Sequence, residues 1–213
     1  MKLENYFAMP FIMVPMPDHQ AVCAELGALF LAREAEGEQW RYRTRRVTQH
    51  GPLFESRFDL FNWPEQPVRK LAEFCNAQLG KLLANVTTLT PEQLQKAKLN
   101  YHAWFHITRK GGFQGLHNHQ NASWSGIFCV DPGDEIEGRS DSGLVRFHDP
   151  RSFYYLDAGN ENLKQPWSHG AFDYRHRAGV LALFPSWAMH EIFPYLGERP
   201  RIVVAFNCWV HYS

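Results

Sequence analysis

The stretch LNYHAWFHIT, residues 99–108, decides the fold of this chain. Every second residue in it is apolar, from Leu99 to Ile107, and the residues between them include Asn100, His102, Trp104 and His106. Successive side chains of a strand point to opposite faces, so this period of two predicts a β-strand with one apolar face. The other face carries imidazole, indole and amide groups, as expected for a strand that faces the interior of a β-barrel.

Four further runs later in the chain have the character of strands. They lie at residues 124–130, 143–148, 179–184 and 201–209. Clusters of Gly, Pro, Asp and Asn separate them and indicate turns. The polar and aromatic segment 149–178 interrupts the series, and connections of this length are often lids or binding loops.

The chain before the first strand has the period of helices. Residues 18–36 and 67–85 carry apolar side chains at helical spacing, and Asp18 and Gly37 are the expected N-cap and stop of the first helix. The sequence TPEQ, residues 90–93, combines a Thr cap, Pro at the first helical position and Gln at the third, and predicts a short helix.

Helices followed by many strands predict a mainly β protein of the α+β class. The expected architecture is a β-sandwich or jelly roll covered by a helical layer. We expect a single domain over residues 1–213, with the helical layer at about 1–98 and the jelly-roll core at about 99–213.

Composition narrows the functional classes. The 213 residues include 22 Lys and Arg against 22 Asp and Glu, so no net charge favours nucleic acid or a membrane surface. Four scattered cysteines without a CxxC pair are typical of reduced core residues in a cytoplasmic protein. The N-terminal segment lacks the uninterrupted apolar run of a signal peptide, and no stretch of 18 apolar residues predicts a membrane span.

Three histidines form the candidate metal site. His117 and His119 are two residues apart, so on an extended chain both imidazoles point to the same side. His190 follows a buried strand and a Pro-Ser-Trp turn, a position from which its side chain would meet them. Three imidazole ligands with open coordination positions suit Fe(II), and suit Zn, Cu or Ni less decisively.

The order of several motifs resembles that of the 2-oxoglutarate/Fe(II)-dependent oxygenases over about residues 99–210. The motifs are Trp104, Gly112, His117-Asn118-His119, Trp124-Ser125-Gly126, Phe147-His148-Asp149-Pro150-Arg151, Phe184-Pro185-Ser186-Trp187 with His190, Glu198-Arg199-Pro200-Arg201 and Phe206-Asn207. The resemblance implies a double-stranded β-helix, Fe(II) as metal, 2-oxoglutarate as co-substrate, O2 as oxidant and hydroxylation of an unidentified substrate. It makes His117 and His190 the two histidines of the usual metal triad, and His119 stands where most relatives carry a carboxylate.

The resemblance also implies where 2-oxoglutarate binds. Arg201 stands eleven residues after His190, where relatives carry the basic residue that pairs with the distal carboxylate. Arg199 is the competing choice. Period two places Arg201 and Asn207 on one face of their strand, so both would reach the interior.

One expected contact to the co-substrate is missing from the motif. Many relatives carry a hydroxyl two residues after the arginine, and this chain has Val203. The replacement contact would come from Tyr101 or Ser125, or be absent.

Four more residues are candidates for supporting or substrate-binding roles. His106 would orient a ligand or be a hydrogen-bonded interior histidine, and Trp104 lies on the same polar face. Core packing is the default reading for Trp124. Asp149-Pro150-Arg151 is expected to be a turn closed by its aspartate, from which Arg151 would reach substrate.

Two other functions remain open from the sequence. A three-histidine, cupin-type dioxygenase would need no 2-oxoglutarate, although the glutamate that a cupin motif places shortly after His119 is absent. The second of these alternatives is a non-catalytic barrel that binds metal or a small acidic ligand. We expect a small-molecule or peptide substrate, no nucleic-acid partner and no membrane, and a homodimer would be unsurprising because the first helices expose apolar residues.

Overall fold

The fold was analysed on a computed structural model that describes residues 7–119, 121–151, 159 and 162–212. The helical elements are α1 His19–Ala35, the 3-10 turn η1 Leu60–Asn62, α2 Gln66–Val86 and α3 Pro91–Lys96. The strands are β1 Ile12–Pro15, β2 Gln49–His50, β3 Leu53–Glu55, β4 Lys98–Thr108, β5 Phe113–His117, β6 Trp124–Asp131, β7 Val145–His148, β8 Ala171–Tyr174, β9 Val180–Pro185, β10 His190–Ile192 and β11 Arg201–His211.

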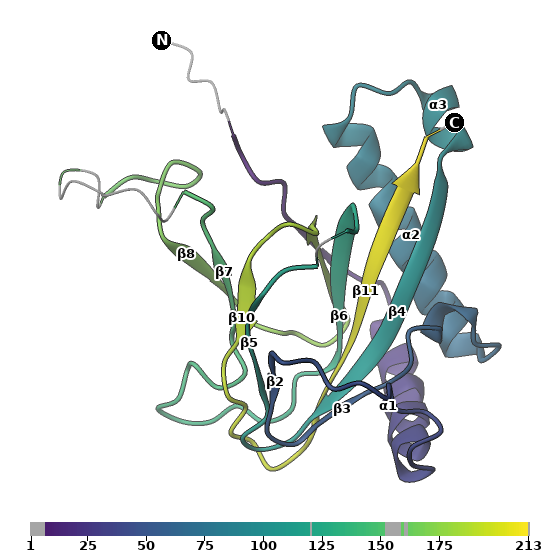
Figure 1. Ribbon diagram of the computed structural model, residues 1–213, viewed down its shortest axis with the longest axis vertical. Helices are drawn as coiled ribbons and strands as arrows, with labels where there is room; N and C mark the ends of the chain where they lie inside the picture. The colour runs from purple at the N-terminus through teal and green to yellow at the C-terminus, as the bar shows by residue number, and fades with distance from the viewer. Residues whose placement is uncertain (1–6, 120, 152–158, 160–161, 213) are drawn as a thin grey trace.

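Two antiparallel sheets form the body of the protein. One has the order β1-β9-β6-β11-β4-β3 and the other the order β2-β5-β10-β7-β8. Helices α1 and α2 lie side by side behind β4 and β11, on the outer side of the larger sheet (Figure 1). Among the described residues no strand pairing joins the sheets, so the jelly roll is two facing sheets and not the closed barrel that the sequence suggested.

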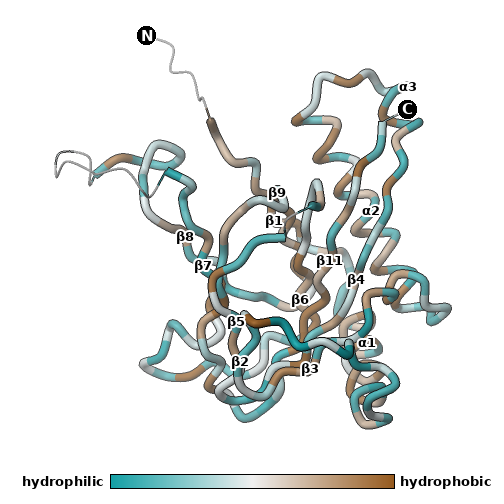
Figure 2. The backbone as a smooth tube through the Cα atoms, viewed as in Figure 1, coloured by the Kyte–Doolittle hydropathy of each residue, from teal (hydrophilic) through white to brown (hydrophobic). Residues whose placement is uncertain are grey.

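The alternation along β4 and β11 separates a core from a cavity. Phe105 and Ile107 of β4, and Phe206 of β11, turn outward and pack under the helices. Phe105 stacks on Phe30 of α1 with ring centroids 4.2 Å apart. Each such buried side chain contributes about 2–3 kcal/mol of apolar transfer, so this layer holds the helices on the sheet. Apolar residues are concentrated along β6 and β11 in the middle of the molecule (Figure 2).

A smaller second core lies between the two sheets. Ile127, Phe147, Phe184, Ile192 and Val203 belong to it. It occupies part of the space between the facing sheets, and the polar residues of β4 and β11 occupy another part. The position of the functional cavity therefore follows from the same period of two that predicted the strand.

The helices and the long strands were predicted correctly. The capping box is present, because the Gln93 N–H donates to Thr90 Oγ1 at 3.3 Å and the Thr90 N–H to Gln93 Oε1 at 2.8 Å. Asp18 is the N-cap residue of α1 as expected, but it has φ 49° and its side chain makes no capping hydrogen bond. No helix in the described part of the chain is long and apolar enough to cross a membrane.

The region before residue 98 is more than a helical layer. Strand β1 pairs with β9, β3 with β4, and β2 with β5, so both sheets contain early strands. These strands have two to four residues, too few for periodicity to reveal. Of the 149–178 segment, the described part contains β8, and residues 152–158, 160 and 161 lie outside the described residues.

Candidate metal centre

Three histidines come together at the edge where β5 ends and β10 begins. His117 is the last residue of β5 and pairs directly with His190, the first residue of β10. His119 lies just beyond the strand, where its backbone N–H donates to Ser186 O at 2.9 Å. One ring nitrogen of each histidine lies within 4.8 Å of the others. Metal–nitrogen bonds of about 2.1 Å allow ligand atoms up to about 4 Å apart, so a small inward movement would close the site.

Backbone carbonyls orient two of the three rings. His117 Nδ1 donates to Gly115 O at 2.7 Å, and His190 Nδ1 donates to Ala188 O at 2.9 Å. A carbonyl only accepts, so the proton is on Nδ1 and the lone pair of Nε2 is left for a metal. Metal-binding histidines usually have such a partner on the second ring nitrogen.

Burial keeps these imidazoles unprotonated. It holds the pKa of His190 well below its ordinary value and also lowers the pKa of His117. The pKa of His119 falls to about 3, mainly by burial and further by the neighbouring His117. Metal binding requires neutral imidazole, so the site is ready for a cation at neutral pH.

The histidines open into a cavity of about 480 Å³ between the sheets. Trp104, His106, Val203 and Asn207 line its walls, and Arg201 also lines it. The Trp104 ring lies 6.0 Å from that of His119, and Thr108 lies four residues further along β4, beside Arg201. Four strand residues span about 13 Å, so the metal centre and Arg201 face the two ends of one elongated space.

Arg201 is a buried cation with no anionic partner among the described residues. It is 3% exposed, its Nη1 donates to Gly143 O at 2.7 Å and its Nη2 to Thr108 Oγ1 at 3.4 Å. No carboxylate of the described residues forms an ion pair with it, and its Nε has no hydrogen-bond partner. Burial lowers its pKa to about 10. Gly143 has φ 62°, and a Cβ there would lie 2.7 Å from Nη1, so glycine permits this contact.

His176, which no motif predicted, lies at the same end of the cavity. It lines the cavity with Arg201, its pKa is depressed by burial and then by the Arg201 charge, and its Nδ1 has no partner. Two unpaired nitrogens beside a cavity are a fit for an anionic group such as a carboxylate. The donor set therefore matches 2-oxoglutarate at this end and a transition metal at the other.

Several predicted contacts to the co-substrate are corrected by the structure. Tyr101 lies on the outer face of β4, where its hydroxyl donates to Asn76 Oδ1 at 3.0 Å, so it cannot replace the missing hydroxyl near Val203. Ser125 Oγ bonds to Asn207 Oδ1 and to Ser186 Oγ, both at 2.8 Å, and so braces Asn207 without lining the cavity itself.

Other candidates also lie away from the histidine cavity. Trp124 packs on the helical side of the sheet, as the core reading expected. Arg151 donates from its backbone N–H and its guanidinium to the carboxylate of Asp149, which closes the predicted turn, and it lines a separate cavity. Arg199 is on the surface, paired with Asp134, so Arg201 and not Arg199 reaches the interior.

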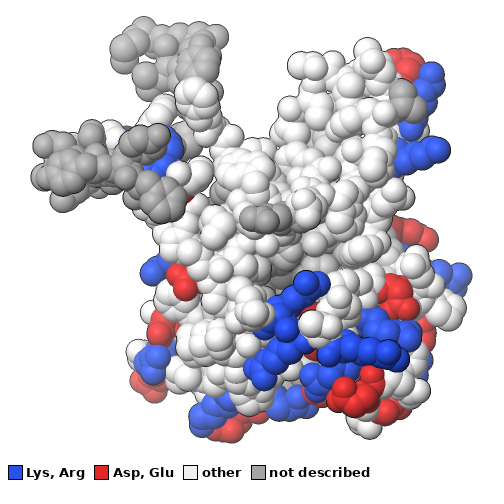
Figure 3. Space-filling view, in the orientation of Figure 1, with Lys and Arg blue, Asp and Glu red and all other residues white. Residues whose placement is uncertain are grey.

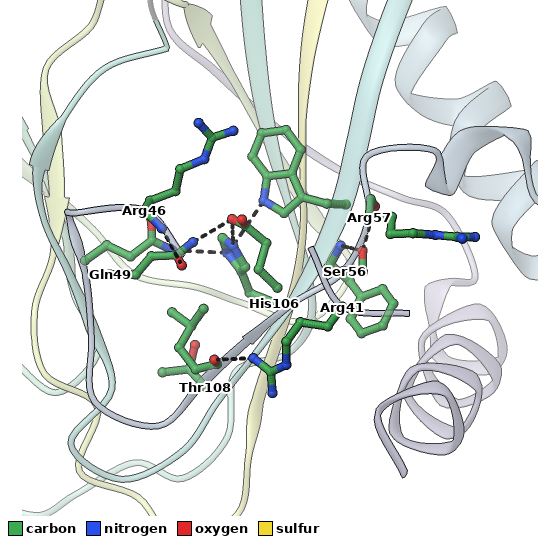
Figure 4. A network of polar contacts seen from close by, with 12 residues as sticks. Arg41, Arg46, Gln49, Ser56, Arg57, His106 and Thr108 are labelled. Atoms are coloured by element: carbon green, nitrogen blue, oxygen red, sulfur yellow. Dashed lines mark hydrogen bonds and ion pairs between the residues drawn. The ribbon is translucent and has the colours of Figure 1, made fainter. Parts of the chain in front are cut away.

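A buried polar network covers one wall of the cavity. His106 Nε2 lies 2.8 Å from Glu55 Oε2, which also accepts from Gln49 Nε2 at 2.6 Å. His106 Nδ1 lies 3.1 Å from Gln114 Nε2, and Trp104 Nε1 lies 3.1 Å from His106 Nε2 (Figure 4). The sequence missed Glu55 because β3 is short, and only its pairing with β4 brings the carboxylate to His106.

Fold and site together define a jelly-roll protein whose facing sheets enclose three histidines and an arginine that forms no ion pair with any described residue. A family model described as "Putative 2OG-Fe(II) oxygenase" matches residues 102–207, which include all four of these residues. The chain belongs to the 2-oxoglutarate/Fe(II)-dependent oxygenases. A sequence search among curated proteins found no significant match.

Solved structures of low sequence identity share the fold. A prolyl-4-hydroxylase from Pseudomonas putida has 15% identity and a TM-score of 0.61, covering 94% of this chain and 92% of its own. The epimerase SnoN of nogalamycin biosynthesis, solved with Fe3+, alpha-ketoglutarate and nogalamycin RO, has 14% identity and a TM-score of 0.62, covering 97% and 82%. A Trichoplax adhaerens prolyl hydroxylase with a hypoxia inducible factor peptide has 12% identity and a TM-score of 0.59, covering 93% and 83%.

The protein is therefore an oxidoreductase that uses Fe(II), 2-oxoglutarate and O2. Of the three functions considered from the sequence, the comparisons therefore support the first.

Proposed function

We propose that His117, His119 and His190 bind the Fe(II) of this oxygenase. The observation that carries the proposal is the convergence of three neutral imidazole nitrogens within 4.8 Å at one end of a cavity. Gly115 O and Ala188 O hold the rings of His117 and His190 so that Nε2 faces the site. His119 would take the place that a carboxylate has in most relatives.

The far end of the cavity would hold the distal carboxylate of 2-oxoglutarate on Arg201. The guanidinium is buried and its Nε is free, and a carboxylate would supply the missing charge and acceptor. His176 would donate a second hydrogen bond, in place of the hydroxyl that Val203 lacks. Asn207, braced by Ser125, would contact the co-substrate or substrate nearer the metal.

When bound, Fe(II) and 2-oxoglutarate supply the oxidising chemistry, in which O2 converts 2-oxoglutarate to succinate and CO2 and hydroxylates a substrate C–H bond. The chain's own residues orient the reactants and limit water. Val203, Ile127 and Ile192 present apolar surface beside the polar anchors. The carboxylate end and the metal end would thus be fixed separately, which leaves one orientation for the co-substrate.

The substrate would enter at the rim of the same cavity, where Phe58, His102 and Trp209 form an aromatic edge. The Arg46 guanidinium lies 5.3 Å from the Phe58 ring centre and points away from the Gln49 and His106 network (Figure 4). In Figure 3, Lys and Arg side chains gather below the hollow of this face. A small molecule or peptide that presents a planar or anionic group would fit this rim. The relative from Trichoplax adhaerens, solved with a peptide, supports the peptide option.

The test is an anaerobic titration of the iron-loaded protein with 2-oxoglutarate, followed by its visible charge-transfer absorption. We expect a band in the parent protein and in Glu191→Gln, no band in His190→Ala, and a much weaker response in Arg201→Met. The residue assignment would be wrong if His190→Ala gave the parental spectrum.

We also propose that the protein is cytoplasmic. All four cysteines are free and buried, which is the state expected in a reducing, cytoplasmic environment. A homodimer stays a prediction, and sedimentation of the purified protein would decide it.

A further inference from the structure

The segment 39–54 carries a local excess of positive charge. It contains four arginines and no Asp or Glu, in a chain whose 22 Lys and Arg are balanced by 22 Asp and Glu. The four are Arg41, Arg43, Arg45 and Arg46. Arg41 pairs with Glu38, whereas no carboxylate of the described residues forms an ion pair with the other three. These three exposed arginines are therefore available to an anionic ligand.

Other exposed arginines of the molecule are used differently. Arg109 pairs with Glu34, and Arg146 pairs with Asp173. In the segment 39–54, Arg45 Nη2 donates to a backbone carbonyl, that of Gly51, at 3.0 Å. A carbonyl satisfies a donor without neutralising its charge, so the positive charge of this segment stays uncompensated.

Strand pairing places one end of the segment beside the metal centre. Strand β2 pairs with β5, and the Gly115 N–H donates to Thr48 O at 2.8 Å just before β2. Because the two chains run antiparallel, Arg46 and His117 each lie two residues beyond this hydrogen bond, at the same end of the pair. Both residues line the histidine cavity. The arginine run thus begins at the metal-facing mouth of the cavity.

Aromatic rings hold the Arg46 guanidinium in place. Tyr42 and Phe58 stack with ring centroids 4.3 Å apart, and the guanidinium carbon of Arg46 lies 5.1 and 5.3 Å from their centres. Contact with a ring face positions a guanidinium without using its N–H groups. In Figure 4 this guanidinium points away from the network around His106. Its donors are free for the bidentate contact that a carboxylate makes.

The extent of the charged segment indicates the size of the ligand. Arg46 lines the cavity of about 480 Å³, but Arg43 and Arg45 lie outside its lining. A ligand that contacts all three must extend beyond the cavity. Val47, which is 95% exposed and also lines the cavity, offers that ligand an apolar contact. Three free arginines on a neutral chain are few for nucleic acid, whose binding rests on many phosphate contacts.

We propose that the substrate is a peptide segment with acidic side chains close to the residue that is oxidised, and that Arg43, Arg45 and Arg46 bind those side chains. The inference rests on the proposed function, because the proposed metal ligands put the reacting carbon at this mouth. Arg46 would bind the acidic group nearest to the reacting residue. Arg45 and Arg43 would bind acidic groups further along the peptide.

The test uses a pool of randomised decapeptides passed over the immobilised, zinc-loaded protein with 2-oxoglutarate. Retained peptides are identified by mass spectrometry. We expect Asp and Glu to be enriched about twofold or more over the input pool at low salt. The enrichment should fall in about 0.5 M NaCl, because salt screens exposed charges. A retained peptide, synthesised and labelled, should bind about 10-fold more weakly, or worse, to the triple variant Arg43→Gln, Arg45→Gln, Arg46→Gln.

A matched variant separates this surface from general charge. Arg69→Gln with Arg177→Gln removes two exposed arginines that also form no ion pair with a described residue, and should change peptide affinity by less than about twofold. The triple variant should keep the parental melting temperature and the absorption band with 2-oxoglutarate. These two readouts show that its fold and co-substrate site are intact.

Three results would overturn the inference. They are retention without acidic enrichment, equal affinity of the retained peptide for the parent and the triple variant, and preferential retention of randomised RNA decamers. Binding of glutarate that depends on Arg46, with no retained peptide, would also overturn it, since the ligand would then be a small acid. If the parent shows the absorption band with 2-oxoglutarate but no acidic enrichment, the oxygenase site stands and only the substrate class is wrong. If the parent shows no band, the proposed function itself is wrong.

Discussion

Replacing Arg201 by methionine is expected to weaken co-substrate binding and stabilise the protein at the same time. The reason is that Arg201 is buried without an anionic partner in the described structure, and burial lowers its pKa to about 10 from 12.5. A pKa difference of this size means that burying the charged guanidinium lowers the free energy of unfolding by about 3 kcal/mol. Methionine has a similar length and no charge, so it would fill the space without this cost.

The gain in stability of Arg201→Met is reduced by the loss of the hydrogen bonds that Arg201 makes. Gly143 O and Thr108 Oγ1 would lose a donor, which costs about 1–2 kcal/mol together. The net expectation is a stabilisation of about 1–2 kcal/mol, or roughly 2–8 °C in the melting temperature of a chain of this size. Loss of the charge-assisted pair should weaken 2-oxoglutarate binding by about 100-fold or more.

The assay is thermal unfolding of the zinc-loaded protein, which cannot turn over, with and without 2-oxoglutarate. At a concentration of about 100 times Kd, the parent should gain about 2.7 kcal/mol, and Arg201→Met almost none. Arg199→Met is the control, since that arginine lies on the surface and pairs with Asp134; it should leave the response to 2-oxoglutarate intact. Parental stabilisation of Arg201→Met by the co-substrate, or a melting temperature many degrees lower, would refute this role for Arg201.

Three further predictions concern the metal site, the core and acid stability. His119→Asp should keep metal binding, because it restores the carboxylate of the common triad. His190→Ala should lower the metal content, measured by elemental analysis, below about one-tenth of that of the parent protein. Equal losses of metal in the two variants would contradict this. Phe105→Ala should cost about 3–5 kcal/mol in urea unfolding, because its ring is fully buried against α1, and Val47→Ala, 95% exposed, should cost less than about 0.5 kcal/mol. The metal-free protein should lose stability as pH falls below about 6.5, because the unfolded chain then binds a proton that His119, with a folded pKa of about 3, does not. The slope is at most about 1.4 kcal/mol per pH unit for this residue, and melting temperatures that are equal at pH 7 and pH 5 would count against it.

Long, regular segments were predictable because their information is local. The period of two in β4 and the helical period of α1 and α2 depend on neighbours in sequence, and the structure has these elements where they were expected. The short strands β3 and β10 were not predicted, because three residues carry no measurable period and pairing with distant strands makes them strands.

At the site, too, the features set by local sequence were predictable. His117 and His119 were paired by spacing, and alternation placed Arg201 and Asn207 on the face that lines the cavity. The prediction for Tyr101 was wrong, because the same alternation puts its side chain with the apolar residues of β4, on the face away from the cavity.

By itself, the sequence determined the strand period, the His-x-His pair, the position of Arg201 and the family they indicate. Only the tertiary structure decided which charges face one another. His176 and Glu55 reach the cavity from segments with no motif, and sheet order, not sequence distance, brings Glu55 beside His106. The structure added that Arg201 is buried and that no carboxylate of the described residues pairs with it, which supports the anion site that the resemblance implied. The physical reason is that periodicity is set by backbone geometry within a segment, whereas desolvation and charge pairing depend on what other segments bring to the same space.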